Sequence, residues 1–161
     1  MDAPSSCLAC ENNNRIDSLP AREFVAADQH WRVAHAFDTA LPGWLILVPR
    51  RHVTAIADLS DSEAANLGGW QVRISRALKA VTGCVKTYVV QFAEAEGFAH
   101  VHFHIVPRMD DLAPDRLGPN IFGLLGVTGD ARVDSKRMDG LARALRTRLA
   151  PDRPATSRSP S

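Results

Sequence analysis

Several features that would indicate particular classes of protein are missing from this sequence. Its 161 residues include three cysteines, which cannot all pair with one another within one chain. Aromatic residues make up only 6% of the chain, and the formal net charge is +1. A charge so close to zero produces no global field that would favour nucleic acid or an anionic membrane. The sequence therefore predicts no nucleic-acid partner.

Long apolar runs are also missing. No run approaches the roughly 18 residues of a transmembrane helix, and the first residues lack the basic and apolar regions of a signal peptide. We therefore expect a cytoplasmic protein without a membrane partner. The length and the 45% apolar composition predict a single domain over residues 1–150. Residues 151–161 are rich in Pro, Ser and Arg and are expected to form a disordered tail.

The spacing of apolar residues predicts an alternation of strands and helices. Strands are expected over residues 23–27, 31–37, 44–48, 85–92 and 100–106. A helix is expected over 60–81, because Ser60 and Glu63 have the spacing of a capping box and Gly83 offers a stop. A second helix is expected over 135–149. With short connections between the strands, this order indicates an α+β fold.

Three histidines alternate with apolar residues in the segment His-Val-His-Phe-His-Ile-Val, which begins at residue 100. A strand turns successive side chains to opposite faces, so His100, His102 and His104 share one face at steps of about 7 Å. At neutral pH an imidazole can serve as a nucleophile, a proton carrier or a metal ligand. A merely solvated face would be built equally well from Thr, Ser, Lys or Glu. The pattern therefore favours a cluster around one anion or metal.

The cysteines suggest a metal site near the N-terminus. Cys7 and Cys10 have the spacing of one half of a structural zinc site, and histidines are the natural complement. A redox pair without metal is the alternative, although such a pair normally opens a helix that follows a strand. Cys84 is interpreted as a small buried apolar residue without a chemical role.

The histidine segment, which ends in Pro-Arg and follows a strand, a helix and a strand, resembles the histidine triad (HIT) family of nucleotide hydrolases and transferases. The resemblance extends to Leu-Ile-Leu-Val-Pro-Arg-Arg-His at 45–52, to Ala-Phe-Asp at 36–38, and to the leading Cys-x-x-Cys. It covers roughly residues 7–108. It implies a five-stranded antiparallel sheet, with a long helix between the third and fourth strands and a C-terminal helix. It also implies a homodimer.

The resemblance assigns a mechanism to the triad. His102 is implied to attack the α-phosphate of a purine nucleotide, while the carbonyl of His100 fixes its tautomer and His104 donates to phosphate or leaving oxygens. The absence of a Gly-x-x-x-x-Gly-Lys loop disfavours a P-loop mechanism. A dinucleoside polyphosphate such as diadenosine tetraphosphate (Ap4A) is the leading substrate. The alternatives are an adenosine 5'-phosphoramidase, a nucleotide-binding module without catalysis, and a protein that uses the triad to bind metal.

The resemblance also implies a zinc ligand set. Zinc-bearing relatives complete the site with the histidine that follows the proline and with the first triad histidine. The implied ligands are therefore Cys7, Cys10, His52 and His100. His30 and His35 are the alternative histidine ligands.

Four further residues are expected to contact the nucleotide. Asp38 is placed to accept hydrogen bonds from the ribose, although an aspartate at this position can also simply form a turn. Phe37 is expected to pack on the base, with a core phenylalanine as the alternative. Gln91 and Arg108 are expected near the phosphate.

The sequence departs from the family pattern in two places. The linker before the triad carries Glu94 and Glu96 and lacks the Gln and hydroxyl residues that relatives often have there. These carboxylates would repel a polyanion unless they point away from it. Trp44 stands where many relatives have a histidine. Both departures leave the substrate preference open.

Overall fold

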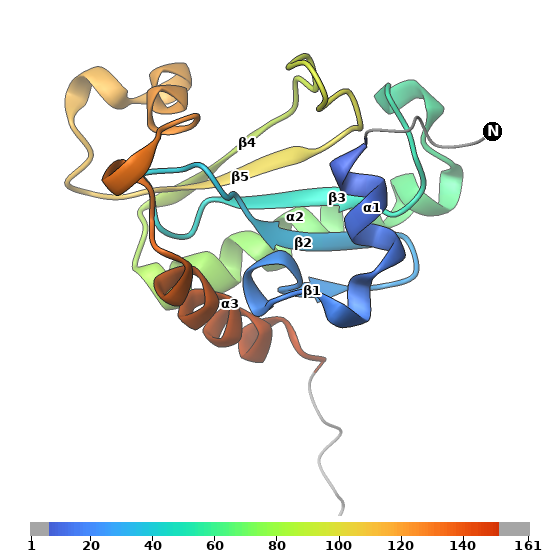
Figure 1. Ribbon diagram of the computed structural model, residues 1–161. Coiled ribbons are helices and arrows are strands. Elements are labelled where there is room, and N and C mark those ends of the chain that lie inside the picture. The colour runs from blue at the N-terminus through green and yellow to red at the C-terminus, as the bar shows by residue number, and fades with distance from the viewer. Residues whose placement is uncertain (1–6, 152–161) are drawn as a thin grey trace, which may run out of the picture.

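The computed structural model describes residues 7–151, and its centre is a five-stranded antiparallel sheet. The strands lie in the order β1-β2-β3-β5-β4, so that β5 separates β3 from β4 (Figure 1). They are β1 (Ala26–Ala27), β2 (Trp31–His35), β3 (Leu45–Pro49), β4 (Lys86–Val90) and β5 (Phe103–Arg108). This architecture confirms the expected α+β fold.

The helices lie on both sides of the sheet. The long helix α2 (Asp61–Thr82) connects β3 to β4 and covers one face, and α3 (Ser135–Leu149) packs beside it (Figure 1). The short helix α1 (Leu8–Asn14) lies in front of β2 and β3 on the opposite side (Figure 1). Within residues 7–151, no helix has both the length and the apolar character needed to cross a bilayer.

The ends of α2 follow from its local sequence. The Ser60 hydroxyl accepts from the amide of Glu63 at 3.2 Å, and the Glu63 carboxylate accepts from the amide of Ser60 at 2.7 Å. This reciprocal pair is the predicted capping box, and it satisfies two amides that the first turn leaves without partners. Gly83 ends the helix with a φ of +73°, a left-handed conformation that favours glycine.

The core lies between α2 and one face of the sheet. Trp31, Leu45, Ile105, Ile74 and Leu78 are all fully buried there. Each fully buried aliphatic side chain of this kind contributes about 2 kcal/mol relative to exposure. Apolar residues at alternate positions of each strand therefore fix which face of the sheet meets α2.

The register places a different set of residues on the opposite face. Ile46 pairs with Ala34 of β2 and with His104 of β5. Directly paired residues of neighbouring strands lie on the same face, so these three form one row across the sheet. Ile46 is only half-buried, because it lines a cavity on this side.

Two expectations about the strands need correction, and the expectation about the tail is not tested. β5 begins at Phe103, not at residue 100, because the amide of Val101 donates to Val53 in the loop after β3 at 2.7 Å. The first strand is only two residues long, because residues 21–23 form a 3₁₀ turn after Pro20. The expected tail after residue 150 lies almost wholly outside the described residues.

Candidate functional site

A cavity of about 460 Å³ opens on the sheet face opposite α2. Ala34, Ile46 and Val48 supply apolar lining from the sheet, and His102 and His104 contribute imidazole rings. Apolar cavities with a few polar groups are typical sites for small molecules. The triad therefore lies where a ligand would meet it.

His102 is oriented by the main chain. Its Nδ1 lies 2.8 Å from the carbonyl oxygen of His100. Because a carbonyl can only accept, Nδ1 carries the hydrogen, and in the neutral ring Nε2 keeps its lone pair. The ring of His104 lies 4.9 Å away between centroids, at an interplanar angle of 74°. His102 thus offers a nucleophilic nitrogen beside a second imidazole.

His104 is a buried neutral base. It is 6% exposed, and its Nδ1 accepts a hydrogen bond from Nε1 of Trp44 at 3.1 Å. Burial, and then the proximity of His102, lowers the pKa of His104 to about 4. At neutral pH this imidazole is therefore uncharged.

The burial of His104 predicts a pH-dependent stability. Its pKa in the folded state, about 4, lies below its ordinary value of 6.5, so the unfolded chain binds the proton more readily between these values. The free energy of unfolding is expected to fall by about 2 kcal/mol through this group between pH 7 and pH 5. Urea denaturation of the metal-free protein at both pH values measures it. His104→Phe should lose this part of the dependence, and an equal dependence in both proteins contradicts the assignment.

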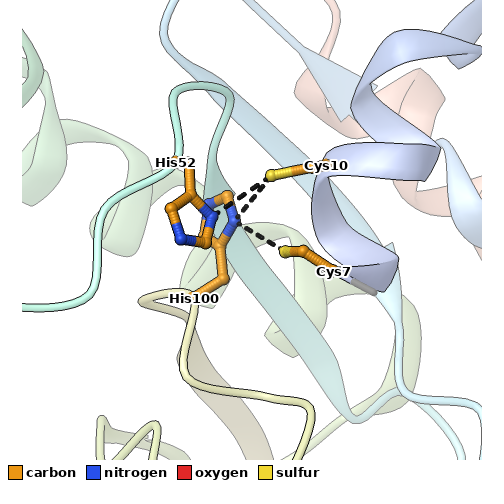
Figure 2. A group of neighbouring side chains, drawn as sticks. All are labelled: Cys7, Cys10, His52 and His100. Carbon is orange, nitrogen blue, oxygen red and sulfur yellow. Dashed lines mark hydrogen bonds between the residues drawn. The ribbon is translucent and has the colours of Figure 1, made fainter. Parts of the chain in front are cut away.

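A second cluster shares His100 with the triad (Figure 2). Its members are Cys7, Cys10, His52 and His100, whose ligand atoms all lie within 4.8 Å of one another. The Sγ atom of Cys10 is 3.3 Å from Nδ1 of His52, and that of Cys7 is 3.4 Å from Nδ1 of His100. Tetrahedral zinc with two sulfur and two nitrogen ligands separates its donors by about 3.4–3.8 Å. The donor types and their spacing therefore fit zinc.

Local structure explains how these four residues meet. Cys7 caps the N-terminus of α1 and Cys10 lies one turn later, so both thiols occupy one side of the helix. His52 follows β3, and His100 precedes β5. The Nε2–H of His100 donates to the carbonyl of Pro49 at 2.9 Å, which leaves Nδ1 to face the thiols.

Burial favours the uncharged forms of Cys10 and His100 in the free cluster. Burial and the neighbouring Cys7 thiol raise the pKa of Cys10 to about 12, and burial lowers the pKa of His100 to about 4. A bound cation would lower the pKa of the Cys10 thiol instead, because metal ligation favours the thiolate. The alternative ligand His35 lies elsewhere, with Nδ1 donating to Ala36 and Nε2 accepting from Gly43. Neither His35 nor His30 belongs to the cluster.

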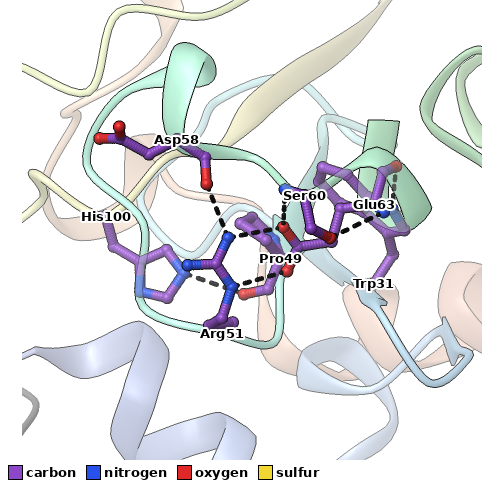
Figure 3. Close-up of polar contacts among 7 residues, drawn as sticks. All are labelled: Trp31, Pro49, Arg51, Asp58, Ser60, Glu63 and His100. Carbon is purple, nitrogen blue, oxygen red and sulfur yellow. Dashed lines mark hydrogen bonds and ion pairs between the residues drawn. The ribbon is translucent and has the colours of Figure 1, made fainter. Parts of the chain in front are cut away.

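The loop that carries His52 is fastened to α2 by Arg51 (Figure 3). The guanidinium of Arg51 donates to both carboxylate oxygens of Glu63, at 3.1 and 2.8 Å, and to the carbonyl of Asp58 at 2.7 Å. Glu63 is only 3% exposed, and the hydrogen bond from Arg51 lowers its pKa. The residue next to His52 is therefore tied to the capping box, which limits the positions that the imidazole can take.

Comparison with protein-family models decides the family. The model described as the HIT domain matches residues 20–111, more than half of the chain. The chain belongs to the histidine triad family. A search of curated proteins finds no match.

Solved structures share the HIT fold over most of their length. A zinc-bound histidine triad family protein from Mycobacterium smegmatis is 20% identical, with a TM-score of 0.65 over 89% of this chain and 93% of that one. A histidine triad protein from Bradyrhizobium japonicum is 25% identical, with a TM-score of 0.65 over 85% and 94%. A hypothetical histidine triad nucleotide-binding protein from Sulfolobus tokodaii is 16% identical, with a TM-score of 0.66 over 89% and 91%.

Two of the expected nucleotide contacts of this HIT protein line the cavity. Phe37 and Asp38 lie in its wall, immediately after the strip of Ala34 and Ala36. Phe37 is 43% exposed and stacks against Phe98, with centroids 6.1 Å apart at 28°. The alternative of a core phenylalanine at position 37 is therefore wrong.

The other two expected contacts do not line the cavity of the HIT domain. Val90 pairs with His104 and shares its face, so the next residue, Gln91, turns away. Phe92 lines the cavity instead. Arg108 lies four residues after His104, about 13 Å along the strand. Its guanidinium forms an ion pair with the carboxylate of Asp110, with Nη1 and Oδ1 3.9 Å apart. Strand register and distance therefore separate these two side chains from the triad in this structure.

The cavity also contains residues that the sequence did not indicate. Phe122 lies in the 3₁₀ segment Gly118–Leu124, which follows β5 and folds back over the HIT domain. Its ring centroid lies 5.1 Å from that of His104 and 5.3 Å from that of Trp44. This segment has no periodic apolar pattern, so no sequence signal marked it. Of the two linker carboxylates, Glu94 lines the cavity and Glu96 does not.

Proposed function

We propose that this HIT protein is a nucleotide hydrolase or transferase that works through a covalent intermediate on His102. The observation that carries the proposal is the 2.8 Å hydrogen bond from Nδ1 of His102 to the carbonyl of His100. It leaves the Nε2 lone pair of His102 as the nucleophile on the lining of the cavity. A neutral imidazole with a free lone pair is a good nucleophile for phosphorus.

The reaction takes two displacements. In the first, the Nε2 lone pair forms a bond to the α-phosphorus, and the bond from phosphorus to the leaving group breaks with its electron pair on the departing atom. His104 stabilises the developing negative charge by donating a hydrogen bond. In the second, water attacks phosphorus, the P–N pair returns to Nε2, and the proton of the water passes to solvent. The products are a nucleoside monophosphate and the released group.

The cavity supports a purine nucleoside as the bound group. Its apolar lining from Ala34 and Ile46 can accept a base, Phe37 can pack on it, and Asp38 can bind the ribose. A dinucleoside polyphosphate such as Ap4A is the leading substrate. The carboxylate of Glu94 in the wall favours the second candidate, an adenosine 5'-phosphoramidate, because that substrate carries less negative charge.

Comparing the hydrolysis of Ap4A with that of an AMP–amine conjugate distinguishes the two candidate functions. We expect the protein to release AMP from either Ap4A or an AMP–amine conjugate, with kcat/KM at least tenfold higher for one of them. Rapid acid quenching followed by peptide mass spectrometry should find a nucleotidyl adduct on His102. Thermal stabilisation by AMP without turnover or adduct would instead identify a nucleotide-binding module, and an adduct on another residue would refute the assignment.

We further propose a structural zinc ion held by Cys7, Cys10, His52 and His100. The four donor atoms support this, since they already lie within 4.8 Å of one another. The ion would fix His100, whose carbonyl orients His102. Zinc would therefore act on the reaction only through the position of the main chain.

We also propose that two copies pair across β4 and α2. β4 is an edge strand of the sheet; Val89 within it is 43% exposed, and Val85, which directly precedes it, is 44% exposed. Val72 on α2 is 48% exposed. Exposed apolar side chains beside an unpaired strand edge favour association. Light scattering should give twice the mass of the chain, and a monomer mass at micromolar concentration would contradict the pairing.

A further inference from the structure

Trp44 makes one polar contact with the triad although it does not line the cavity. Its side chain is fully buried, and its indole Nε1–H lies 3.1 Å from Nδ1 of His104. An indole nitrogen can only donate a hydrogen bond. Nδ1 of His104 must therefore hold a lone pair, and in the neutral ring the hydrogen resides on Nε2.

The imidazoles of His102 and His104 are thus held in opposite tautomers. His102 donates from Nδ1 to a carbonyl and keeps a lone pair on Nε2. His104 accepts at Nδ1 and keeps a hydrogen on Nε2. One ring can attack phosphorus and the other can only donate. The different hydrogen-bond partners, a main-chain carbonyl for His102 and an indole for His104, determine which ring attacks and which ring donates.

The indole is itself held rigidly. The carbonyl of Trp44 accepts from the amide of Ala36 at 2.9 Å, and the amide of Gly43 donates to Nε2 of His35 at 2.9 Å. Gly43 has a φ of +87°, which only glycine adopts easily. The ring of Phe122 meets Trp44 and His104 edge-on, with centroids 5.3 and 5.1 Å away. The donor therefore has little freedom to leave Nδ1.

We propose that Trp44 is a positioning residue for nucleotidyl transfer, whose indole N–H holds His104 in the tautomer that donates from Nε2 to the reacting phosphate. The inference rests on the proposed function for its catalytic consequence. The tautomer itself is a property of the protein without substrate. The two parts can therefore fail separately.

The first test is spectroscopic. A long-range ¹H–¹⁵N correlation spectrum of the zinc-loaded protein at pH 7 should show His104 with Nε2 protonated and Nδ1 bare. In Trp44→Phe, which keeps an aromatic ring but has no donor, the Nδ1 signal should move to an averaged or protonated position. A wild-type spectrum with Nδ1 protonated overturns the proposal, and so does an unchanged His104 signal in the variant.

The second test is kinetic. Trp44→Phe should lower kcat about tenfold or more and change KM less than about threefold, because the lost hydrogen bond acts in the transition state. Trp70→Phe is the matched control, since its buried indole N–H donates to Asp28 away from the cavity, at 2.7 Å. It should lower stability while His104 and kcat remain unchanged. Equal kcat for Trp44→Phe and wild type overturns the positioning role, whereas an inactive wild type refutes only the proposed function.

Discussion

His102→Ala is expected to lower kcat for nucleotide hydrolysis by about 10⁴-fold or more, because no other group supplies the attacking lone pair. The loss should fall on kcat, since Phe37, Asp38 and the apolar lining that would bind the nucleoside are unchanged. Binding of AMP, measured by calorimetry, should stay within about threefold of wild type. Initial rates of AMP release measure the effect.

His30→Ala is the control for the loss of an imidazole. His30 lies in the turn between β1 and β2, and it does not line the cavity. Its replacement should leave both kcat and nucleotide binding unchanged. Turnover of His102→Ala within about tenfold of wild type would place the nucleophile on another residue.

Cys10→Ser is expected to remove the zinc ion and to lower the melting temperature by about 10 °C. Zinc at about a thousand times its dissociation constant stabilises the folded state by about 4 kcal/mol, and a chain of this size loses about 2–4 °C per kcal/mol. A strong chelator should lower the melting temperature of wild type by a similar amount. It should have little effect on the variant. Scanning calorimetry and metal analysis of the purified proteins measure both quantities.

Cys84→Ala is the matched control for this experiment. Cys84 is also buried, but it lies in the main core and outside the metal cluster. This variant should keep one zinc per chain and its sensitivity to the chelator. A Cys10→Ser protein that retains stoichiometric zinc would exclude the proposed ligand set.

The parts of the fold that depend on neighbouring residues were predictable from the sequence. Ser60 and Glu63 predict the start of α2, because a capping box involves only one helical turn. The alternation of His100, His102 and His104 predicted a common face, and all three rings line the same cavity. The bounds of the strand were wrong: it begins later because Val101 pairs with a loop that is distant in sequence, and it ends at Arg108.

The parts of the site that depend on register and on long-range packing were not predictable. Gln91 and Phe92 are neighbours, and only the pairing of β4 with β5 decides which of them reaches the cavity. Trp44 stands where relatives have a histidine, and nothing in the neighbouring sequence showed that its N–H reaches His104 on β5, the strand beside β3. Phe122 comes from a segment without an apolar period, so its contacts with His104 and Trp44 could be identified only from the folded structure.

The position of β5 between β3 and β4 has a consequence for how the chain folds. β5 is the last strand of the sheet in sequence, yet Leu45 must pair with Ile105 and Val90 with His104 before the sheet closes. Closing the loop between β3 and β5 costs conformational entropy before the contacts between these strands can offset it. Insertion of β5 is therefore expected to limit the folding rate. Until then β3 and β4 expose unpaired edges, which invite association with other chains. Because β5 carries His104 and continues directly from His102, the reactive groups assemble in the same step that closes the sheet.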